Sequence, residues 1–384
     1  MISILFLSIL VLFFILIKKF KLSFNKLIIC IFSLFIIIFF ININSAIEGV
    51  TSASLLCANA IIPTVFPFSV ICNLIISYNG INYYSKVLEK PIYKILGLSK
   101  ASAFPIIASF LCGYPLGAKY SSEIYEKGYI SKEEYSRLIN IATNCGPLFI
   151  VGSVSSAMLN NTNIGYYLLI ANYLSVIIIA IITKKNTSSN CIIKKNLENT
   201  TTSSFGENFK NAIDNAIKTT LCVIGFILIF AVLINILKNS MLFISDINNI
   251  ESILNIPHNL LSALLLGLIE ITTGIKLICI VSAPFTLKLA LISFLCSFSG
   301  LSIISQSLAF ISKNNICISK FIFLKFFQGI ISFIITYLLF SILDYSTFTL
   351  SFFNNDAFSI NINYISIIIN ILFLICFIFC IKRR

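Results

Sequence analysis

Long apolar runs separated by short polar loops dominate the pattern along this chain. A membrane-spanning helix needs about 20 predominantly apolar residues. Runs of about this length occupy residues 2–17, 27–43, 59–78, 164–183, 219–237, 321–343 and 363–381. Because the runs are continuous and do not alternate between apolar and polar positions, they exclude an outer-membrane barrel. The pattern therefore predicts an all-α fold, namely a polytopic helical membrane protein.

Three further apolar stretches are interrupted by Gly, Pro, Ser, Thr and Asn. They cover residues 101–118, 141–160 and 257–311. Such residues break helices and leave backbone polar groups free. At membrane depth those groups must be satisfied by protein or by a water-filled cavity. We therefore treat the broken segments as candidate ligand sites.

The distribution of Lys predicts how the chain is oriented, since cytoplasmic loops carry an excess of basic residues. The loops 344–362 and 238–256 are poor in Lys and are predicted to lie outside. The basic segments, predicted to be cytoplasmic, are 18–26, 79–100, 184–204, 313–325 and Lys382–Arg384.

These assignments constrain the broken segments. Because residues 100 and 184 lie on the same side, 101–118 must dip into the membrane and return. The intervening 119–140 then stays cytoplasmic, with a capping box from Ser131 to Glu134. In the second part of the chain, one of 257–279 and 284–311 must also be re-entrant, and the sequence leaves open which. The count is nine spans, with the N-terminus outside and the C-terminus inside.

Short motifs recur along the chain at a nearly constant spacing. Asn59-Ala60-Ile61 recurs as Asn215-Ala216-Ile217, Gly117 aligns with Gly274, and Gly146 aligns with Gly300. An odd number of spans between the copies predicts two inverted repeats with broken helices, which is a transporter architecture. The predicted parts are an N-terminal transmembrane hairpin (1–44), a first repeat (45–183), a cytoplasmic linker (184–212), a second, inverted repeat (213–345) and a C-terminal loop with a transmembrane helix (346–384).

Composition narrows the chemistry. Only 11% of the residues are charged, against about 25% in soluble proteins, so a soluble enzyme is excluded. We assign the net charge of +13 to membrane orientation and expect no nucleic-acid partner. The 12 Cys include no C-x-x-C pair and are interpreted as small buried apolar residues. No P-loop, H-E-x-x-H or Ser/His/Asp arrangement occurs, so we predict no enzymatic activity, no catalytic residues, no cofactor and no metal site.

Glu270 stands out as a carboxylate inside the apolar segment GLIEITTG, residues 267–274. At bilayer depth an ionised side chain costs about 2.5–3.5 kcal/mol on insertion scales, so it is usually functional or paired. We predict an ion-coupling role for Glu270. The alternatives are a structural ion pair with Lys276 or Lys288, or a shallow hairpin in contact with water.

The broken segments supply the candidate substrate-binding residues. A helix that restarts at Gly146-Pro147 presents unpaired N–H groups and a positive dipole end, which favour a carboxylate or phosphate oxygen. The alternative is that small residues allow close helix packing. The predicted substrate-binding residues are Gly113, Pro115, Gly117, Thr143, Asn144, Gly146, Pro147, Thr272, Thr273, Gly274, Ser299 and Gly300.

Three of these segments also carry a family resemblance. They read FPIIASFLCGYPLGAK (104–119), NCGPLFIVGSV (144–154) and GLIEITTGI (267–275). They resemble the sporulation integral membrane protein (YlbJ, or SpoVV) family over roughly residues 45 to 345. That family carries duplicated nucleoside-recognition Gate regions, which also occur in concentrative nucleoside transporters and in the ferrous-iron transporter FeoB. The two predicted repeats would correspond to the Gate regions.

The resemblance implies a transporter of a small organic anion, dipicolinate first among them, in the outer forespore membrane during sporulation. A planar aromatic dicarboxylate would suit paired helix ends at Gly146-Pro147 and Gly300-Leu301. The alternatives are a nucleoside or cation transporter, or a non-transporting membrane scaffold for assembly of the spore and its cortex. The expected partners are the anion, the lipid bilayer, and further copies of the chain or other sporulation membrane proteins.

Overall fold

The computed structural model describes residues 24–78, 80, 96–184, 204–238, 241–311 and 316–342. All regular elements in these ranges are helical, so the predicted all-α membrane fold is confirmed. The predicted spans 2–17 and 363–381 and the predicted outer loop 344–362 lie outside the described residues. Residues up to Tyr337 form one compact unit.

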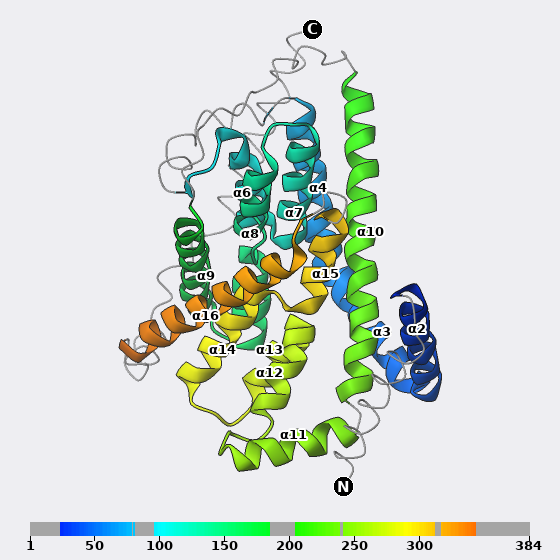
Figure 1. Cartoon of the computed structure of the whole chain (residues 1–384), viewed down its shortest axis with the longest axis vertical. Helices are drawn as coiled ribbons and strands as arrows, with labels where there is room; N and C mark the ends of the chain where they lie inside the picture. Colours follow the sequence, from blue (N-terminus) through cyan, green and yellow to red (C-terminus); the bar gives the residue numbers. More distant parts are fainter. Residues whose placement is uncertain are drawn as a thin grey trace. The chain divides into compact units, whose positions relative to one another are not determined.

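The helices fall into two consecutive sets (Figure 1). The first half of the chain contains α2 (Phe24–Ile41), α3 (Ile43–Leu56), the π-helix η1 (Cys57–Ile61), α4 (Ile62–Ser77), the 3₁₀-helix η3 (Lys100–Ser102), α6 (Ala103–Cys112), α7 (Tyr114–Glu126), α8 (Lys132–Ile141), the π-helix η4 (Leu148–Met158) and α9 (Thr162–Ile182). The second half contains α10 (Phe205–Lys238), α11 (Met241–Ile253), α12 (Leu260–Ile269), α13 (Ile271–Ile280), α14 (Phe285–Phe298), α15 (Gly300–Ile311) and α16 (Ile318–Ile342).

Four helical stretches in the described ranges are long and apolar enough to cross a membrane, and a bent pair at the start would make five. The total of nine spans stays a prediction, because part of the chain is not described. The four stretches are Thr162–Ile182, Phe205–Lys238, Phe285–Ile311 and Ile318–Ile342.

The order of elements in the first half recurs in the second. A long helix (α3–η1–α4, then α10) precedes a helical hairpin (α6–α7, then α12–α13), a broken helix (α8–η4, then α14–α15) and a closing helix (α9, then α16). The two long helices run antiparallel. The Ser45 carbonyl accepts a hydrogen bond from Asn235, and Gly49 packs against the Ala231 carbonyl. The boundaries proposed for the repeats stay a prediction.

Each hairpin turns at one residue between two short helices. The α6–α7 hairpin turns at Gly113, whose φ of +92° favours glycine. The α12–α13 hairpin turns at Glu270, and its arms touch at Gly267 and Gly274, since a Cβ on Gly274 would lie 2.1 Å from the Gly267 Cα. Segment 101–118 thus turns back on itself, as expected for a dip. Of the two open alternatives, 257–279 is the hairpin and 284–311 is the broken span.

The segment 119–140 differs from expectation. Ser131 caps α8 as predicted, because its hydroxyl accepts the Glu134 N–H at 3.2 Å. The Glu134 carboxylate, however, accepts the Ser99 N–H and the Ser102 hydroxyl instead of closing a capping box. Tyr120 and Tyr135 are fully buried. We expected a helix in water, but α8 packs into the core because its polar side chains find partners inside the protein.

Candidate functional site

One cavity of about 180 Å³ lies among the helix breaks. Three of the four breaks line it directly, and the helix that follows the fourth break, α15, lines it with its first turns. Its walls come from the α6–α7 turn, the α8–η4 break, the α12–α13 turn and the first turns of α15, and from the long helices α4 and α10. Most of the lining is apolar and includes the aromatic rings of Phe68 and Phe149. The polar lining residues are Tyr114, Ser153, Glu270, Thr272, Ser302 and Gln306.

The predicted site residues divide into two groups in the structure. Gly113, Pro115, Gly146, Glu270 and Thr272 line the cavity. The others lie in or beside the same breaks but are not part of its lining. They are Gly117, Thr143, Asn144, Pro147, Thr273, Gly274, Ser299 and Gly300.

Small residues let each broken helix cross a hairpin at backbone contact. A Cβ on Gly146 would lie 3.2 Å from the Gly113 nitrogen, and one on Gly117 would collide with the Ala142 carbonyl. In the second half, a Cβ on Gly300 would lie 3.2 Å from the Gly267 carbonyl oxygen. Close packing therefore explains Gly117 and Gly300, whereas Gly146 both packs and faces the cavity.

Polar side chains satisfy the carbonyl groups exposed where α8 ends. The last carbonyls of a helix lack intrahelical partners. The Thr143 hydroxyl donates to the Ile139 carbonyl at 2.7 Å, and the Asn144 amide donates to the Ile141 carbonyl. The Thr143 carbonyl itself accepts a hydrogen bond from the ammonium group of Lys325. Thr143 and Asn144 thus stabilise the break without facing the cavity.

Lys325 is a site residue that the sequence analysis missed, because it was counted with the predicted cytoplasmic loop 313–325. The structure places it within α16, with only 1% of its surface exposed. Its ammonium also donates to Asn144 Oδ1 at 3.3 Å and to Gln328 Oε1 at 2.9 Å. Among the described residues, no carboxylate forms an ion pair with Lys325. The available signal was the placement of Lys and Gln inside an otherwise apolar run.

Glu270 caps α13 from the turn of the second hairpin. Its two carboxylate oxygens accept the N–H groups of Thr272 and Thr273, each at 2.8 Å. Lys276 is exposed, and the Lys288 ammonium donates to the carbonyls of Cys279 and Val281. The structure therefore shows neither of the two ion pairs considered for Glu270.

Two further carboxylates accept N–H groups at or just before a helix start. Glu251, in the predicted outer loop 238–256, accepts the N–H groups of Asn259, Leu261 and Ser262 at the start of α12. Glu134 accepts the Ser99 N–H just before η3 and α6. Among the described residues, no carboxylate accepts an N–H group at the start of α7, whose N-cap is Gly113. This uncapped start lies on the cavity wall.

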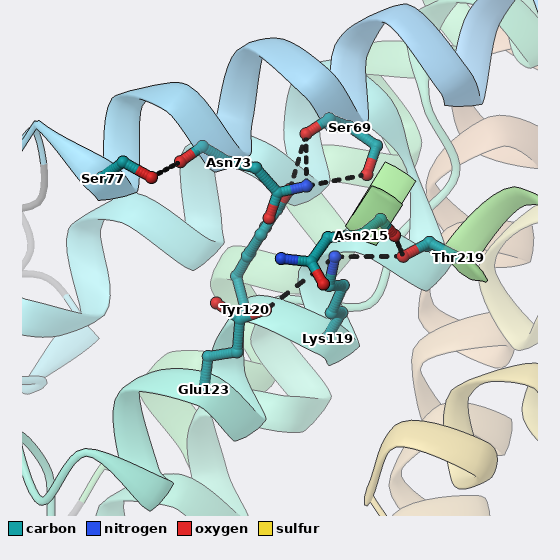
Figure 2. Close-up of polar contacts among 8 residues, drawn as sticks. All are labelled: Ser69, Asn73, Ser77, Lys119, Tyr120, Glu123, Asn215 and Thr219. Carbon is teal, nitrogen blue, oxygen red and sulfur yellow. Dashed lines mark hydrogen bonds and ion pairs between the residues drawn. The ribbon is translucent and has the colours of Figure 1, made fainter. Parts of the chain in front are cut away.

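A second polar cluster joins α4, α7 and α10 (Figure 2). The Lys119 ammonium donates to the Thr219 hydroxyl at 3.0 Å and lies 3.9 Å from the Glu123 carboxylate. The Tyr120 hydroxyl and the Asn73 amide both donate to the Ser69 carbonyl, at 3.4 and 2.8 Å. Lys119 therefore fixes the hairpin against the long helix of the second half.

Comparisons with known proteins agree with the motif resemblance. No protein-family model matches the chain, and no solved structure matches it significantly. The chain is similar to the sporulation integral membrane protein YlbJ of Bacillus subtilis (strain 168). The two are 25% identical over 296 residues, which cover 70% of this chain and 71% of the relative. This similarity supports the suspected resemblance to YlbJ, and together with the apolar helices it supports the assignment as a multi-pass integral membrane protein.

Proposed function

We propose that this chain is a secondary transporter that moves a small organic anion during sporulation, with dipicolinate as the first candidate and the outer forespore membrane as its location. The link to sporulation rests on the similarity to a sporulation integral membrane protein. The substrate class rests on the chemistry of the cavity wall. In this proposal the chain carries out no enzymatic reaction.

The uncapped start of α7 is the observation that carries the proposal. Gly113 occupies the position in the first hairpin that Glu270 occupies in the second. The N–H groups at a helix start attract a carboxylate, and Glu270 binds two such groups within the protein. At α7, Pro115 lacks an N–H, whereas Tyr114 lines the cavity beside Gly113, so we assign the Tyr114 N–H to a substrate carboxylate. The substrate would thus fill the place that Glu270 fills in the other hairpin.

The rest of the lining suits a planar ring. The rings of Phe68 and Phe149 and the side chains of Val223 and Ile227 provide apolar walls. Aromatic rings stack or meet edge to face in such surroundings. The hydroxyl of Ser302 and the amide of Gln306 add hydrogen-bonding groups on the opposite half of the chain. A small aromatic carboxylate can therefore contact both halves at once.

A nucleoside is the second candidate. Among the described residues, the lining includes the carboxylate of Glu270 and neither Lys nor Arg. A neutral ring with hydrogen-bond donors would meet no repulsion from Glu270, and Gln306 could bind its polar edge. This alternative predicts that a nucleoside competes with, or replaces, the anion as substrate.

Uptake by the purified protein in lipid vesicles would test the proposal. Labelled dipicolinate and a labelled nucleoside are offered separately. The cavity is blocked by Ser153→Phe on η4, and Ser156→Phe, on an exposed face of the same helix, is the matched control. We expect dipicolinate uptake by the parent protein and by Ser156→Phe but not by Ser153→Phe. Uptake of the nucleoside alone would favour the second candidate, and uptake of neither would favour the scaffold.

A further inference from the structure

Three oxygen atoms surround the ammonium group of Lys325 at the end of α8. They are the Thr143 carbonyl, Asn144 Oδ1 at 3.3 Å and Gln328 Oε1 at 2.9 Å. An ammonium has three N–H donors and no acceptor. The number of oxygens equals the number of donors, so the site is built for a positive charge.

The equivalent break in the second half is closed by neutral groups. There the Cys296 carbonyl accepts a hydrogen bond from the Tyr114 hydroxyl, and the Ser297 hydroxyl accepts one from the Asn172 amide at 2.8 Å. Cys296, Ser297 and Lys325 lie 153 positions after Thr143, Asn144 and Asn172 respectively, one position short of the spacing between Gly146 and Gly300. Closing such a break therefore requires no charge, and the ammonium at the first break needs another explanation.

The surroundings of Lys325 are those of a cation site. The side chain is 1% exposed, and no carboxylate pairs with it among the described residues. The carbonyl end of α8 carries the negative end of the helix dipole. In transporters, unwound carbonyls and the C-terminal ends of half-helices coordinate alkali cations. A ligand set of uncharged oxygens suits a monovalent cation, since nothing in it would neutralise a second charge.

We propose that the Lys325 ammonium is a tethered cation that occupies a monovalent-cation site formed by the Thr143 carbonyl, Asn144 Oδ1 and Gln328 Oε1. The site needs no free ion while the lysine is present. Shortening the side chain opens a space that a small cation such as Na⁺, K⁺ or NH₄⁺ enters. This inference does not depend on the identity of the transported substrate.

The test compares two substitutions of Lys325 in the purified full-length protein. Lys325→Ala removes the charge and leaves space, whereas Lys325→Met removes the charge and fills the space. Lys320→Ala removes an exposed lysine from the same helix and is the control for net charge. Thermal unfolding is followed in the chloride salts of Na⁺, K⁺, NH₄⁺ and the bulky N-methyl-D-glucamine cation at equal ionic strength.

We expect Lys325→Ala to melt several degrees lower than the parent protein in the N-methyl-D-glucamine salt. At least one small cation should raise that melting temperature with saturation, as expected for a ligand that binds the folded state. The parent protein, Lys320→Ala and Lys325→Met should show no such preference.

Equal melting temperatures of Lys325→Ala in all four salts would overturn the proposal. So would a response of Lys325→Met as large as that of Lys325→Ala, because the filled site has no room for an ion. If Lys325→Ala cannot be extracted in folded form with N-methyl-D-glucamine, extraction is repeated in each salt. Recovery of monodisperse protein only in a small-cation salt supports the proposal, and failure in every salt rejects it.

Discussion

The side-chain amide of Asn172 in α9 donates a hydrogen bond of 2.8 Å to the hydroxyl of Ser297 in α14. The closing helix of the first half thus holds the broken helix of the second half. The converse contact also exists, since Gln328 of α16 donates to Asn144 Oδ1 at the α8–η4 break at 3.1 Å. The two halves are therefore fastened crosswise at their breaks.

The Asn172–Ser297 contact predicts a measurable interaction energy. We expect Asn172→Ala and Ser297→Ala each to lower the free energy of unfolding, because both groups are fully or almost fully buried. In a double-mutant cycle the interaction energy should be about 0.6 kcal/mol, the average for hydrogen bonds between membrane helices. Unfolding of the purified variants in denaturing detergent measures it, and strictly additive effects would contradict the contact.

The crossing of Gly113 and Gly146 predicts that one methyl group at this point impairs transport. A Cβ on Gly146 would press on the Gly113 backbone at 3.2 Å, whereas a Cβ on Gly152, on η4, would meet only a Leu148 methyl at 3.7 Å. Gly146→Ala should therefore lower substrate affinity about tenfold, the equivalent of about 1.4 kcal/mol, and Gly152→Ala should not. Vesicle uptake over a range of substrate concentrations is the measurement. Equal uptake by both variants would leave Gly146 without a role in binding.

Glu270 and Glu251 allow coupling to be separated from capping. Both carboxylates accept N–H groups at helix starts, but only Glu270 lines the cavity. Glu270→Gln and Glu251→Gln should each cost about 1–2 kcal/mol of stability through a weakened cap. Only Glu270→Gln should abolish accumulation driven by a pH gradient while exchange at equal pH continues.

Vesicle uptake with and without a pH gradient measures this difference. Normal gradient-driven accumulation by Glu270→Gln would remove the ion-coupling role. Loss of accumulation by both variants would assign the effect to the cap.

The predicted orientation can be checked by thiol labelling in a Cys-free background. Ser131, before α8, and Ser252, in α11, are both exposed and are predicted to lie on opposite sides of the membrane. An impermeant reagent added to intact cells should label Ser252→Cys and leave Ser131→Cys unlabelled until the cells are opened. The reverse result would invert the topology, and labelling of both positions from outside would contradict the dip of 101–118.

The sequence located the breaks because they are local. Gly, Pro and Asn mark the Gly113 turn and the α8–η4 break, and the alignment of Gly117 with Gly274 already places Gly113 opposite Glu270. The resemblance to YlbJ was likewise found in the residues that form these breaks. What each break residue contacts was not predictable, because its partners come from distant helices.

Lys325 shows the limit most clearly. By its position in the sequence alone, Lys325 extends the basic segment 313–325, and the excess of Lys there predicts a cytoplasmic location. Two of its three acceptors come from one segment about 180 positions away, and the third comes from its own helix. Glu270 shows the same limit in milder form. The free-energy cost of burying a carboxylate in an apolar segment singled out Glu270 in the sequence. Whether its carboxylate forms an ion pair or caps a helix depends on backbone geometry, which the sequence does not show.

The contact between Gly267 and Gly274 has a consequence for how this protein enters the bilayer. The arms α12 and α13 have 10 residues each, about 15 Å at 1.5 Å per residue, which is half of the roughly 30 Å hydrocarbon core. Neither arm can cross alone, yet the two in one straight helix would be long enough. The turn at Glu270 breaks the helix, and the meeting of the two glycines lets the arms fold back on each other. The glycine pair therefore helps decide on which side of the bilayer the chain after α13 emerges, and with it the direction in which α14, α15 and α16 run.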